Sequence, residues 1–385
     1  MSEYRLDELC EILDSKRVPL SAMQRAKRKG PYPYYGAQSV IDHVDDYLLD
    51  GEYLLVAEDG ANLVTRTQDI ANLVNGKIWV NNHAHILGYN GKCPLRLLGF
   101  LLNNSNISPY VTGCAQPKLN QENLRRITFS LPEKVDEVSS ILSSLDSKIE
   151  NNRKVCANLE AQAQALFKHW FIDFAPFKDG KFVESELGMI PEGWRVGRLS
   201  CLGDIIGGAT PSKSVESNYC QDGIHWLTPK DLSKNCLKFT SRGETDITLE
   251  GYTSCSAKIM PRGSVLFSSR APIGYLTIAK NEICTNQGFK SIVPRYAGTA
   301  YLYYLLKYNT KRIESMASGT TFKEASGSLM KSLPIIIPTK SYLIKFETCV
   351  KDLFDEQELL ESQISRLSTL RDTLLPKLMS GAIKV

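Results

Sequence analysis

The sequence predicts an α+β protein with two β-rich globular domains in tandem, each followed by a long α-helix. Three observations predict it. Patterns in the first half of the 385-residue chain recur about 206 positions later. An uninterrupted heptad pattern closes each half, which is typical of long paired helices. The remaining blocks carry short apolar or alternating runs between turn residues, as β-rich domains do.

The internal repeat is visible in matched local patterns. Gly113 precedes a Gln-Pro-Lys-Leu segment, and Gly319, 206 positions later, precedes a Thr-Phe-Lys-Glu segment. Upstream, residues 78–83 resemble residues 282–287 when Asn82 is matched with Asn286, and residues 50–56 resemble residues 261–267. A period of this length is too long for a solenoid, so it indicates two copies of a domain-sized unit.

We divide the chain into residues 1–132 and 179–338 as globular domains, and residues 133–178 and 339–385 as helical segments. Within the globular domains, apolar and alternating runs predict strands and helices. Strands are expected at 53–57, 77–80, 264–267, 275–278, 291–293 and 333–337, and helices at 6–13, 95–102 and 300–316.

Each helical segment carries a seam with alternating steps of three and four residues. An isolated helix would leave these apolar rows in water, so we expect the two helices to pair as a coiled coil. The alternative is that each helix packs only on its own domain. The first seam consists of Leu142, Leu145, Ile149, Asn152, Cys156, Leu159, Ala163, Leu166 and Trp170. The second lies 208 positions later, at Val350, Leu353, Gln357, Leu360, Ile364, Leu367, Arg371, Leu374 and Leu378. Polar seam positions such as Asn152, Gln357 and Arg371 commonly set register.

Composition indicates a globular protein, with 43% hydrophobic and 23% charged residues. No apolar stretch approaches the ~18 residues of a membrane span, and the first residues lack the apolar core of a signal peptide. We therefore expect a cytoplasmic protein without a membrane partner. The ten cysteines form no Cys-x-x-Cys pair, so free thiols are expected rather than a zinc site.

The net charge of +4 is unevenly distributed. Residues 181–338 hold 19 basic and 13 acidic side chains, whereas residues 1–132 hold 14 of each and the helical segments are neutral or slightly acidic. A basic domain is compatible with a polyanionic partner, and near-neutral helices suit a protein partner.

Searches for catalytic motifs find none, so the chain is predicted to be non-catalytic, with no catalytic residue and no metal ligand. Residues 207–214 have the spacing of a phosphate-binding loop, but Ser212 replaces its second glycine and Pro211 removes a backbone donor. We interpret this stretch as a turn. His83 and His85 suit either metal binding or nucleic-acid contact.

Several polar stretches suit contact with nucleic acid instead. Asn and Gln can pair with adenine, Arg and Lys with guanine, and lysines also meet phosphates. Each candidate also has an ordinary structural explanation, because most tyrosines are half-buried and most lysines are solvated. The candidates are Lys27, Arg28, Lys29, Tyr32, Tyr34, Tyr35, Asn81, Asn82, His83, His85, Thr210, Ser212, Lys213, Lys230, Arg270, Asn286, Gln287 and Lys323.

Taken together, these patterns resemble the specificity (S) subunits of type I restriction–modification systems. The resemblance covers nearly the whole chain, in the order of that family. It is carried by residues 30–37, 57–60, 79–85, 166–171, 190–194, 208–212 and 374–381. One departure is that the first copy lacks Gly-x-Thr-Pro-Ser and has residues 16–21 in that place. This difference bears on the DNA target rather than on the family.

The resemblance implies two target recognition domains, each reading one half of a bipartite, asymmetric site in double-stranded DNA. It implies an antiparallel coiled coil with pseudo-two-fold symmetry, which fits the local two-fold symmetry of the DNA backbones. Two methyltransferase subunits would carry S-adenosylmethionine and methylate adenine, and two restriction subunits, where present, would use ATP and magnesium. No cofactor is expected on this chain.

Two other functions remain open from the sequence. One is a two-domain coiled-coil scaffold that binds only protein, which would lack the steep salt dependence of DNA binding. The other is a self-contained enzyme, which would transfer methyl groups to DNA without a partner.

Overall fold

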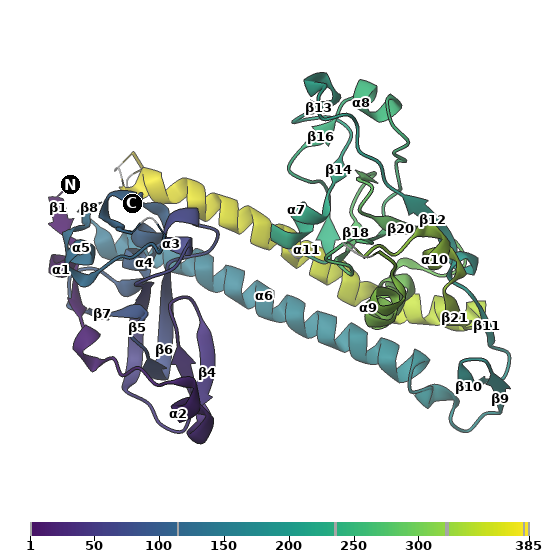
Figure 1. Ribbon diagram of the computed structural model, residues 1–385, viewed down its shortest axis with the longest axis horizontal. Coiled ribbons are helices and arrows are strands. Elements are labelled where there is room, and N and C mark those ends of the chain that lie inside the picture. The colour runs from purple at the N-terminus through teal and green to yellow at the C-terminus, as the bar shows by residue number, and fades with distance from the viewer. Residues whose placement is uncertain (1, 114, 235–236, 320–322, 380–381, 384–385) are drawn as a thin grey trace. The chain divides into compact units, whose positions relative to one another are not determined.

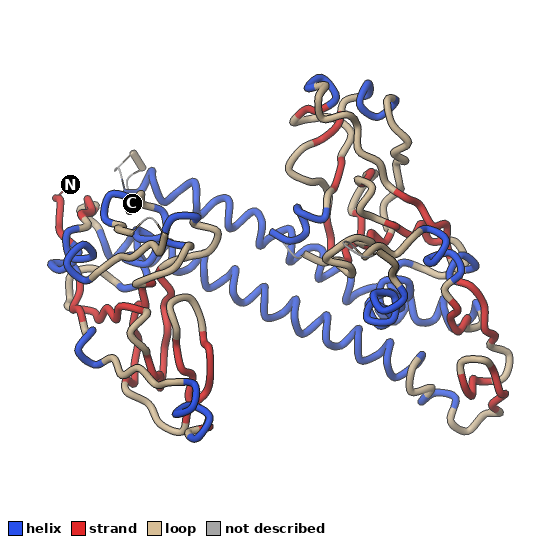
Figure 2. Tube along the Cα trace, in the orientation of Figure 1, coloured by secondary structure: helices blue, strands red, loops and turns tan. Residues whose placement is uncertain are grey.

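The computed structural model describes residues 2–113, 115–234, 237–319, 323–379 and 382–383. The chain forms two compact units: unit 1 comprises Met1–Glu150 and Arg366–Val385, and unit 2 comprises Asn151–Ser365. Each unit combines one β-rich domain with parts of both long helices (Figures 1 and 2). Cys114, Cys236 and the last two residues of the C-terminal motif, Ser380 and Gly381, lie outside the described residues.

Unit 1 is built on a six-stranded sheet in the order β2-β7-β5-β6-β3-β4. Its neighbouring strands are antiparallel except for the parallel pair β3 and β6. A separate antiparallel pair, β1 and β8, leads into the first long helix. The strands are β1 (Ser2–Arg5), β2 (Cys10–Ile12), β3 (Lys29–Tyr35), β4 (Val40–Val44), β5 (Leu49–Ala57), β6 (Ala71–Val80), β7 (Ala84–Tyr89) and β8 (Thr128–Leu131).

Among the helices of unit 1, α4 packs against the inner strands β5, β6 and β7. Leu97, Leu98 and Leu102 of α4 are fully buried in a core that also holds Leu54 and Leu87 of the sheet. The helices are α1 (Leu6–Leu9), α2 (Ala22–Lys27), α3 (Asn62–Thr65), α4 (Leu95–Asn104), α5 (Gln121–Arg126) and α6 (Val135–Phe171), which continues into unit 2.

Unit 2 is built on a five-stranded sheet in the order β12-β20-β17-β18-β15, with four further two-stranded pairs. The sheet strands are β12 (Gly203–Gly207), β15 (Phe239–Thr240), β17 (Val265–Phe267), β18 (Leu276–Ala279) and β20 (Lys290–Pro294). The paired strands are β9 (Phe182–Ser185) with β10 (Gly188–Pro191), β11 (Arg195–Arg198) with β21 (Pro334–Ile337), β13 (Tyr219–Cys220) with β16 (Asp246–Ile247), and β14 (Trp226–Leu227) with β19 (Cys284–Thr285).

The core of unit 2 forms where α9 packs against β17, β18 and the long helices. Tyr301, Tyr304 and Leu302 of α9 are buried there with Phe167 and Phe346. The helices are α7 (Pro229–Lys234), α8 (Leu249–Thr253), α9 (Thr299–Met316), α10 (Gly327–Ser332) and α11 (Lys340–Met379), whose end belongs to unit 1. Within the described ranges, no helix is both long enough and apolar enough to cross a membrane.

Most predicted elements are present, and one is wrong in part. The six expected strands and the helices at 95–102 and 300–316 are confirmed, with ends that differ by at most six residues. The expected helix at 6–13 is only one turn long, because Cys10–Ile12 forms β2 and pairs with β7. Strand pairing across the chain overrides the local helical pattern there.

The internal repeat is confirmed by matched backbone hydrogen bonds inside the two units. The Leu6 amide donates to the Ile127 carbonyl at 2.8 Å, and the Leu199 amide donates to the Leu333 carbonyl at 2.9 Å. Isolated bridges join Thr112 to Lys118 in unit 1 and Ser318 to Glu324 in unit 2, again 206 positions apart. The two units therefore share these local backbone contacts, although their sheets differ in strand number.

The long helices contact each other within both units. In unit 1, Arg371 of α11 donates to Asp146 of α6 at 2.8 Å. In unit 2, Asn152 of α6 donates to Gln363 at 3.1 Å, and the Phe167 and Phe346 rings lie 6.0 Å apart. Each helix also packs on the domain of each unit.

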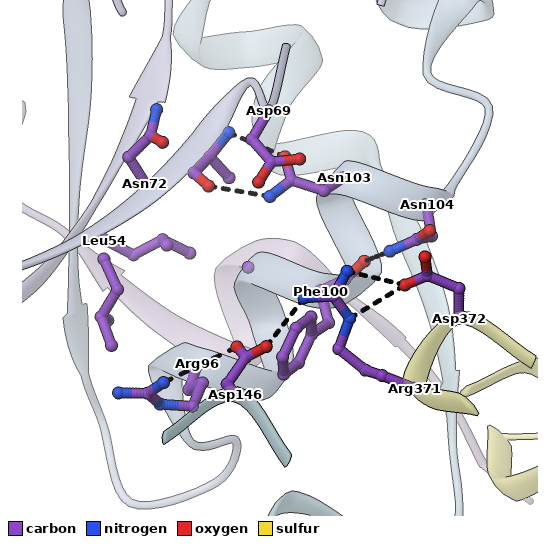
Figure 3. A pocket seen from close by; sticks show the side chains of 13 residues that line it. Leu54, Asp69, Asn72, Arg96, Phe100, Asn103, Asn104, Asp146, Arg371 and Asp372 are labelled. Carbon is purple, nitrogen blue, oxygen red and sulfur yellow. Dashed lines mark hydrogen bonds and ion pairs between the residues drawn. The ribbon is translucent and has the colours of Figure 1, made fainter. Parts of the chain in front are cut away.

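Arg371, a polar interruption of the second seam, borders a pocket of about 300 Å³ in unit 1 (Figure 3). Its guanidinium also lies over the Phe100 ring, with the carbon 5.7 Å from the centroid. Asn103, which lines the same pocket, binds the start of β6: its side-chain oxygen accepts hydrogen bonds from the Ile70 and Ala71 amides at 2.9 Å. The seam arginine thus joins both helices to α4.

Gln357, another polar seam position, belongs to a buried cluster around Lys238 in unit 2. The Lys238 ammonium donates to Glu160 at 2.7 Å, to the Tyr304 hydroxyl at 2.9 Å and to Gln357 at 3.2 Å. Glu361 of α11 accepts from the Lys238 amide at 3.1 Å. Burial lowers the pKa of Lys238 to about 8, against the opposing effect of Glu160. This cluster fastens β15 to both long helices.

Candidate nucleic-acid interface

The structure brings five of the predicted contact residues together in unit 2. They line a single hollow of about 540 Å³, together with Trp226, Tyr219 and Glu244. The sequence placed them in three separate stretches, and the fold closes these stretches around one space. The five residues are Thr210, Lys213, Lys230, Asn286 and Gln287.

Backbone contacts hold the polar rim of this hollow. The Asn286 amide donates to the Leu227 carbonyl at 3.0 Å, and its side-chain oxygen accepts from the Gly288 amide at 2.9 Å. The indole of Trp226 donates to the Ala209 carbonyl at 3.1 Å, which fixes the loop that carries Thr210. Asn286 therefore shapes the turn, while the next side chain, Gln287, is exposed.

Two exposed lysines stand at the hollow and can reach a polyanion. Lys230, on the first turn of α7, keeps 72% of its side chain exposed and lies 3.9 Å from Glu244. Lys213 is exposed on the loop after β12. Such surface pairs are weak, so a phosphate can replace Glu244 as the partner of Lys230 at little cost.

The other three candidates of unit 2 do not line the hollow. Arg270 pairs with Glu324 at 3.0 Å, and Glu324 also pairs with Lys290 at 3.2 Å. Ser212 is exposed and shares a 2.8 Å hydrogen bond with Ser214. Lys323 is exposed as well.

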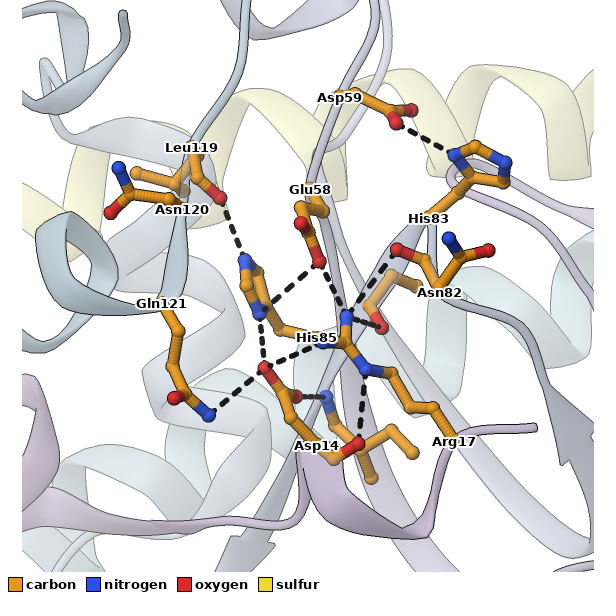
Figure 4. A network of polar contacts seen from close by, with 12 residues as sticks. Asp14, Arg17, Glu58, Asp59, Asn82, His83, His85, Leu119, Asn120 and Gln121 are labelled. Carbon is orange, nitrogen blue, oxygen red and sulfur yellow. Dashed lines mark hydrogen bonds and ion pairs between the residues drawn. The ribbon is translucent and has the colours of Figure 1, made fainter. Parts of the chain in front are cut away.

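In unit 1 the corresponding surface is the turn at residues 81–83, between β6 and β7. The buried side chain of Asn81 accepts from the His83 amide at 2.8 Å, while Asn82 is exposed. The His83 ring is half-exposed and lies 2.6 Å from an Asp59 carboxylate oxygen (Figure 4). Asn82 and His83 are thus the polar side chains that this turn presents to solvent.

Below the turn lies a buried network of charges. One ring nitrogen of His85 lies 2.6 Å from Asp14 and the other 2.7 Å from the Leu119 carbonyl. Arg17 donates to Glu58 at 2.5 Å and to the Ala84 carbonyl at 3.1 Å (Figure 4). The network therefore anchors the start of β7 from both sides.

The carboxylates of this network stay ionised. Burial raises the pKa of Asp14, but hydrogen bonds from His85 and the Ile86 amide and the charges of His85 and Arg17 outweigh it, so the pKa lies below 3.8. The pKa of Glu58 is lowered in the same way, because hydrogen bonds from Arg17 and Lys118 outweigh burial.

Three candidates in unit 1 need correction. Tyr34 and His85 are fully or almost fully buried, and Asn81 is 4% exposed. Tyr34 accepts from the Leu20 amide at 2.8 Å, and the partners of the other two lie within the same unit. Side chains so enclosed do not face DNA, and their burial satisfies polar groups of the chain instead.

The basic run around residue 28 is largely neutralised. Arg28 pairs with Asp45 at 2.8 Å and stacks over Trp79 at 4.7 Å, and Lys29 pairs with Asp42 at 2.5 Å. Lys27, at the end of α2, is exposed. The run thus contributes ion pairs to Asp42 and Asp45, while Lys27 and Lys29 stay exposed.

The remaining tyrosines have structural contacts. The Tyr32 ring lies 5.2 Å from the Tyr47 ring, with the Lys77 ammonium 4.6 Å from the latter. Tyr35 is half-buried, and burial raises the pKa of its hydroxyl.

Asp14 was not singled out from the sequence, and Arg17 and Glu58 were given no place in a polar network. Asp14 begins a short 3₁₀ turn and Arg17 follows its end, far in sequence from His85 and Glu58. No local pattern joins these segments, so only the fold reveals the network.

Comparison with known proteins bears on both units. The chain matches the family described as "Type I restriction modification DNA specificity domain" over residues 1–161 and 191–342. The MjaIX specificity subunit of a type I restriction enzyme from Methanocaldococcus jannaschii is 40% identical over 179 residues. That alignment covers 46% of this chain and 41% of that subunit, so this chain spans less than half of that relative.

Two further comparisons cover nearly the whole chain. The HindI specificity subunit of Haemophilus influenzae is 26% identical over 443 aligned positions, covering 97% of this chain and 91% of that subunit. A crystal structure of the S subunit of a type I restriction-modification system from M. genitalium has the same fold, with a TM-score of 0.62 at 15% identity, and covers 98% and 95% of the two chains. The chain therefore belongs to the family of type I restriction–modification specificity subunits and contains two target recognition domains.

Proposed function

We propose that this chain is the DNA sequence-specificity subunit of a type I restriction–modification complex. Each target recognition domain binds one half of a bipartite, asymmetric site in double-stranded DNA. The chain itself carries no catalytic step and binds no cofactor, and the complex works in the cytoplasm. Family membership and the repeat inside the chain support this proposal.

The observation that carries DNA reading is the hollow of unit 2. Thr210, Asn286 and Gln287 supply hydrogen-bonding groups, and Lys213 and Lys230 supply charge at the same place. Carboxamides can read adenine edges, whereas lysines bind phosphates and position the protein on the duplex. Both chemistries converge on one surface, as a base-reading site requires.

The long helices are proposed to form an antiparallel coiled coil with pseudo-two-fold symmetry. Such a pair fixes the distance between the two half-sites, because a helix lengthens by about 1.5 Å per residue. The contacts of α6 with α11 inside each unit support this arrangement. Apolar side chains of α11 that remain exposed suit the docking of protein partners; these are Ile344, Leu359 and Leu370.

The proposed partners supply the chemistry. Two methyltransferase subunits dock on the helices and methylate the exocyclic amino group of adenine with S-adenosylmethionine. Two restriction subunits, in systems that cleave DNA, use ATP and magnesium.

The decisive experiment expresses the chain with its methyltransferase subunit and maps methylated adenines in the host DNA. The proposal expects one bipartite motif, and binding of the complex to that motif should weaken steeply with salt. A complex that assembles but neither binds DNA nor directs methylation would favour a protein-binding scaffold instead. Methyl transfer by the purified chain alone would overturn the assignment of catalysis to a partner.

A further inference from the structure

We propose that Asn82 and Gln287 are equivalent specificity-determining residues, each reading one base pair at the same place in its own half-site. The proposal rests on the proposed function and goes beyond it, because it assigns one side chain to each half-site. The sequence alignment matched Asn82 with Asn286. The structure shifts this match by one residue.

The shift of one residue follows from Asn81 and Asn286, which precede Asn82 and Gln287. Asn81 and Asn286 both end a parallel strand pair, and each backbone amide donates across it, to Tyr35 at 3.2 Å and to Leu227 at 3.0 Å. Each side-chain oxygen then accepts from the amide two residues later, at 2.8 Å in unit 1 and 2.9 Å in unit 2. Asn81 and Asn286 therefore make the same Asx turn.

His83 and Gly288, which follow Asn82 and Gln287, make matching backbone hydrogen bonds in the two units. The His83 carbonyl accepts from the Glu58 amide at 2.9 Å, and the Gly288 carbonyl accepts from the Ser269 amide at 2.7 Å. Farther on, the Glu58 carbonyl accepts from Leu119 and the Ser269 carbonyl from Ala325, both at 2.8 Å. The backbone on both sides of the two proposed reading residues thus has one geometry.

The loop in front of each turn is tied down in the same manner. The Val18 amide donates to the Val80 carbonyl at 3.3 Å, and the Ala209 amide donates to the Thr285 carbonyl at 2.9 Å. A tryptophan indole also donates to the carbonyl of each loop residue, from Trp79 of β6 to Val18 at 2.7 Å and from Trp226 of β14 to Ala209 at 3.1 Å, so the two indoles come from different strands of the matched pairs. Residues 16–21 therefore stand in the place of Gly-x-Thr-Pro-Ser and are tied to the strand by the same backbone hydrogen bond.

Asn82 and Gln287 are more exposed than the turn-forming residues before them, and their side chains make none of the hydrogen bonds that form the turns. Both side chains are exposed, whereas the turn-forming Asn81 is buried and Asn286 is half-buried. Asn82 has no side-chain partner among the described residues, and within the same ranges the Gln287 side chain accepts a hydrogen bond from Thr210 alone. A rigid frame with one unconstrained polar side chain is the arrangement expected of a residue that reads a ligand.

The chemistry of the pair agrees with this role. Both are carboxamides, which offer a donor and an acceptor side by side and pair with the N6 and N7 edge of adenine. Thr210 donates to the Gln287 oxygen, and the Gln287 amino group keeps its donors for a ligand. In DNA recognition, a good bidentate pair discriminates by about 1–3 kcal/mol, or roughly 5- to 150-fold.

The test uses Asn82→Ala and Gln287→Ala, each expressed with the methyltransferase subunit, and maps methylated adenines. Each variant should lose discrimination about tenfold at a single base pair, one in each half-site. The two relaxed positions should lie at the same distance from the methylated adenine of their half-sites. Asn75→Ala and Gln221→Ala change exposed carboxamides of the two domains, away from the long helices, the hollow and the turn at 81–83, and should leave the motif unchanged.

The outcomes separate this inference from the proposed function. If the unaltered chain directs no sequence-specific methylation, the proposed function fails. If it does, and both alanine variants keep the full motif or relax the same half-site, the inference is overturned. If an alanine variant abolishes methylation, the corresponding amide exchange, Asn82→Gln or Gln287→Asn, is tested instead. Binding of that complex to DNA carrying single-base variants of the motif is then measured. Altered discrimination at one base pair supports the inference, and equal loss at all positions contradicts it.

Discussion

His83 and His85 stand two residues apart, yet the first is half-exposed and the second is fully buried. The His-x-His pattern predicts a shared strand face, but burial depends on Asp14 and Leu119, which come from other segments. The sequence could therefore predict which polar side chains are present near the turn, but not which of them face solvent. Among the predicted contact residues, Asn82 and Gln287 are exposed, whereas Tyr34 and His85 are buried.

Asp14 is expected to make unit 1 sensitive to acid. Its pKa is lower in the folded state than its ordinary value of 3.8. Its stabilising contribution is therefore present above pH 3.8 and is lost as the pH falls through the folded-state pKa. Asp14→Asn should lower stability near pH 7 by about 2 kcal/mol, through lost charged hydrogen bonds, and flatten this acid dependence. Hydrogen exchange of the Ile86 amide, which donates to Asp14 at 3.0 Å, measures both effects. Equal acid dependence in the two proteins would contradict this role.

Lys238 is a second residue whose importance only the fold reveals. Its ammonium is 3% exposed and lies 3.6 Å from the centroid of the Phe354 ring. Lys238→Met should destabilise unit 2 by about 2–4 kcal/mol, because it leaves Glu160, Gln357 and the Tyr304 hydroxyl short of a buried partner. Hydrogen exchange of the Ile278 amide, which bonds the Lys238 carbonyl, reports this loss.

Lys234 provides the control for that substitution. It is half-exposed on α7 and pairs with Glu244 at the surface. Lys234→Met should change the free energy of opening, measured from the same amide exchange, by less than about 1 kcal/mol, since surface pairs contribute little. Equal effects of the two substitutions would show that Lys238 does not fasten β15 to the helices.

At the scale of elements, α6 and α11 could be predicted because their periodicity is local and sustained. The predicted seam positions are buried or half-buried along both helices. The flanking residues Phe167 and Phe354 were missed as core residues, since they face the domain beside the seam. The helix expected at 6–13 was wrong in part for the opposite reason, because the three residues of β2 pair with β7, which lies far away in the sequence.

Two neighbouring residues of α6 test its packing in unit 1. Leu142 is fully buried in the core that contains Leu375 and Leu378, whereas Ile141 is 36% exposed. Leu142→Ala should lower the free energy of unfolding by about 2–4 kcal/mol, because apolar burial is lost and a cavity is left. Ile141→Ala should cost less than about 1 kcal/mol. Amide hydrogen exchange in α4 compares the two, and a reversed order would show that the helix is rotated from the face seen here.

At the scale of the whole molecule, the sequence revealed the duplication, the excess of basic residues in its second half and the near-neutral helices. What it could not supply was the register between the copies, which the Asx turns at Asn81 and Asn286 correct by one residue. It also could not show that three distant stretches enclose one polar hollow in unit 2. Both features depend on contacts between segments far apart in the chain.

The central claim is that the helices act as a ruler between two DNA-reading domains, and a length change tests it most directly. Seven residues are inserted into α6 after Glu150 and into α11 after Ser365, where the two units meet in sequence. Each insertion lengthens its helix by about 10 Å. The same seven residues inserted between β9 and β10, after Glu186, serve as the control.

Mapping of methylated adenines gives the readout. The account predicts that the lengthened chain reads the same bases in both half-sites with a gap longer by about three base pairs, given a rise of 3.4 Å per pair, and that the control keeps the original gap. A lengthened chain that methylates the original motif with an unchanged gap would contradict the ruler.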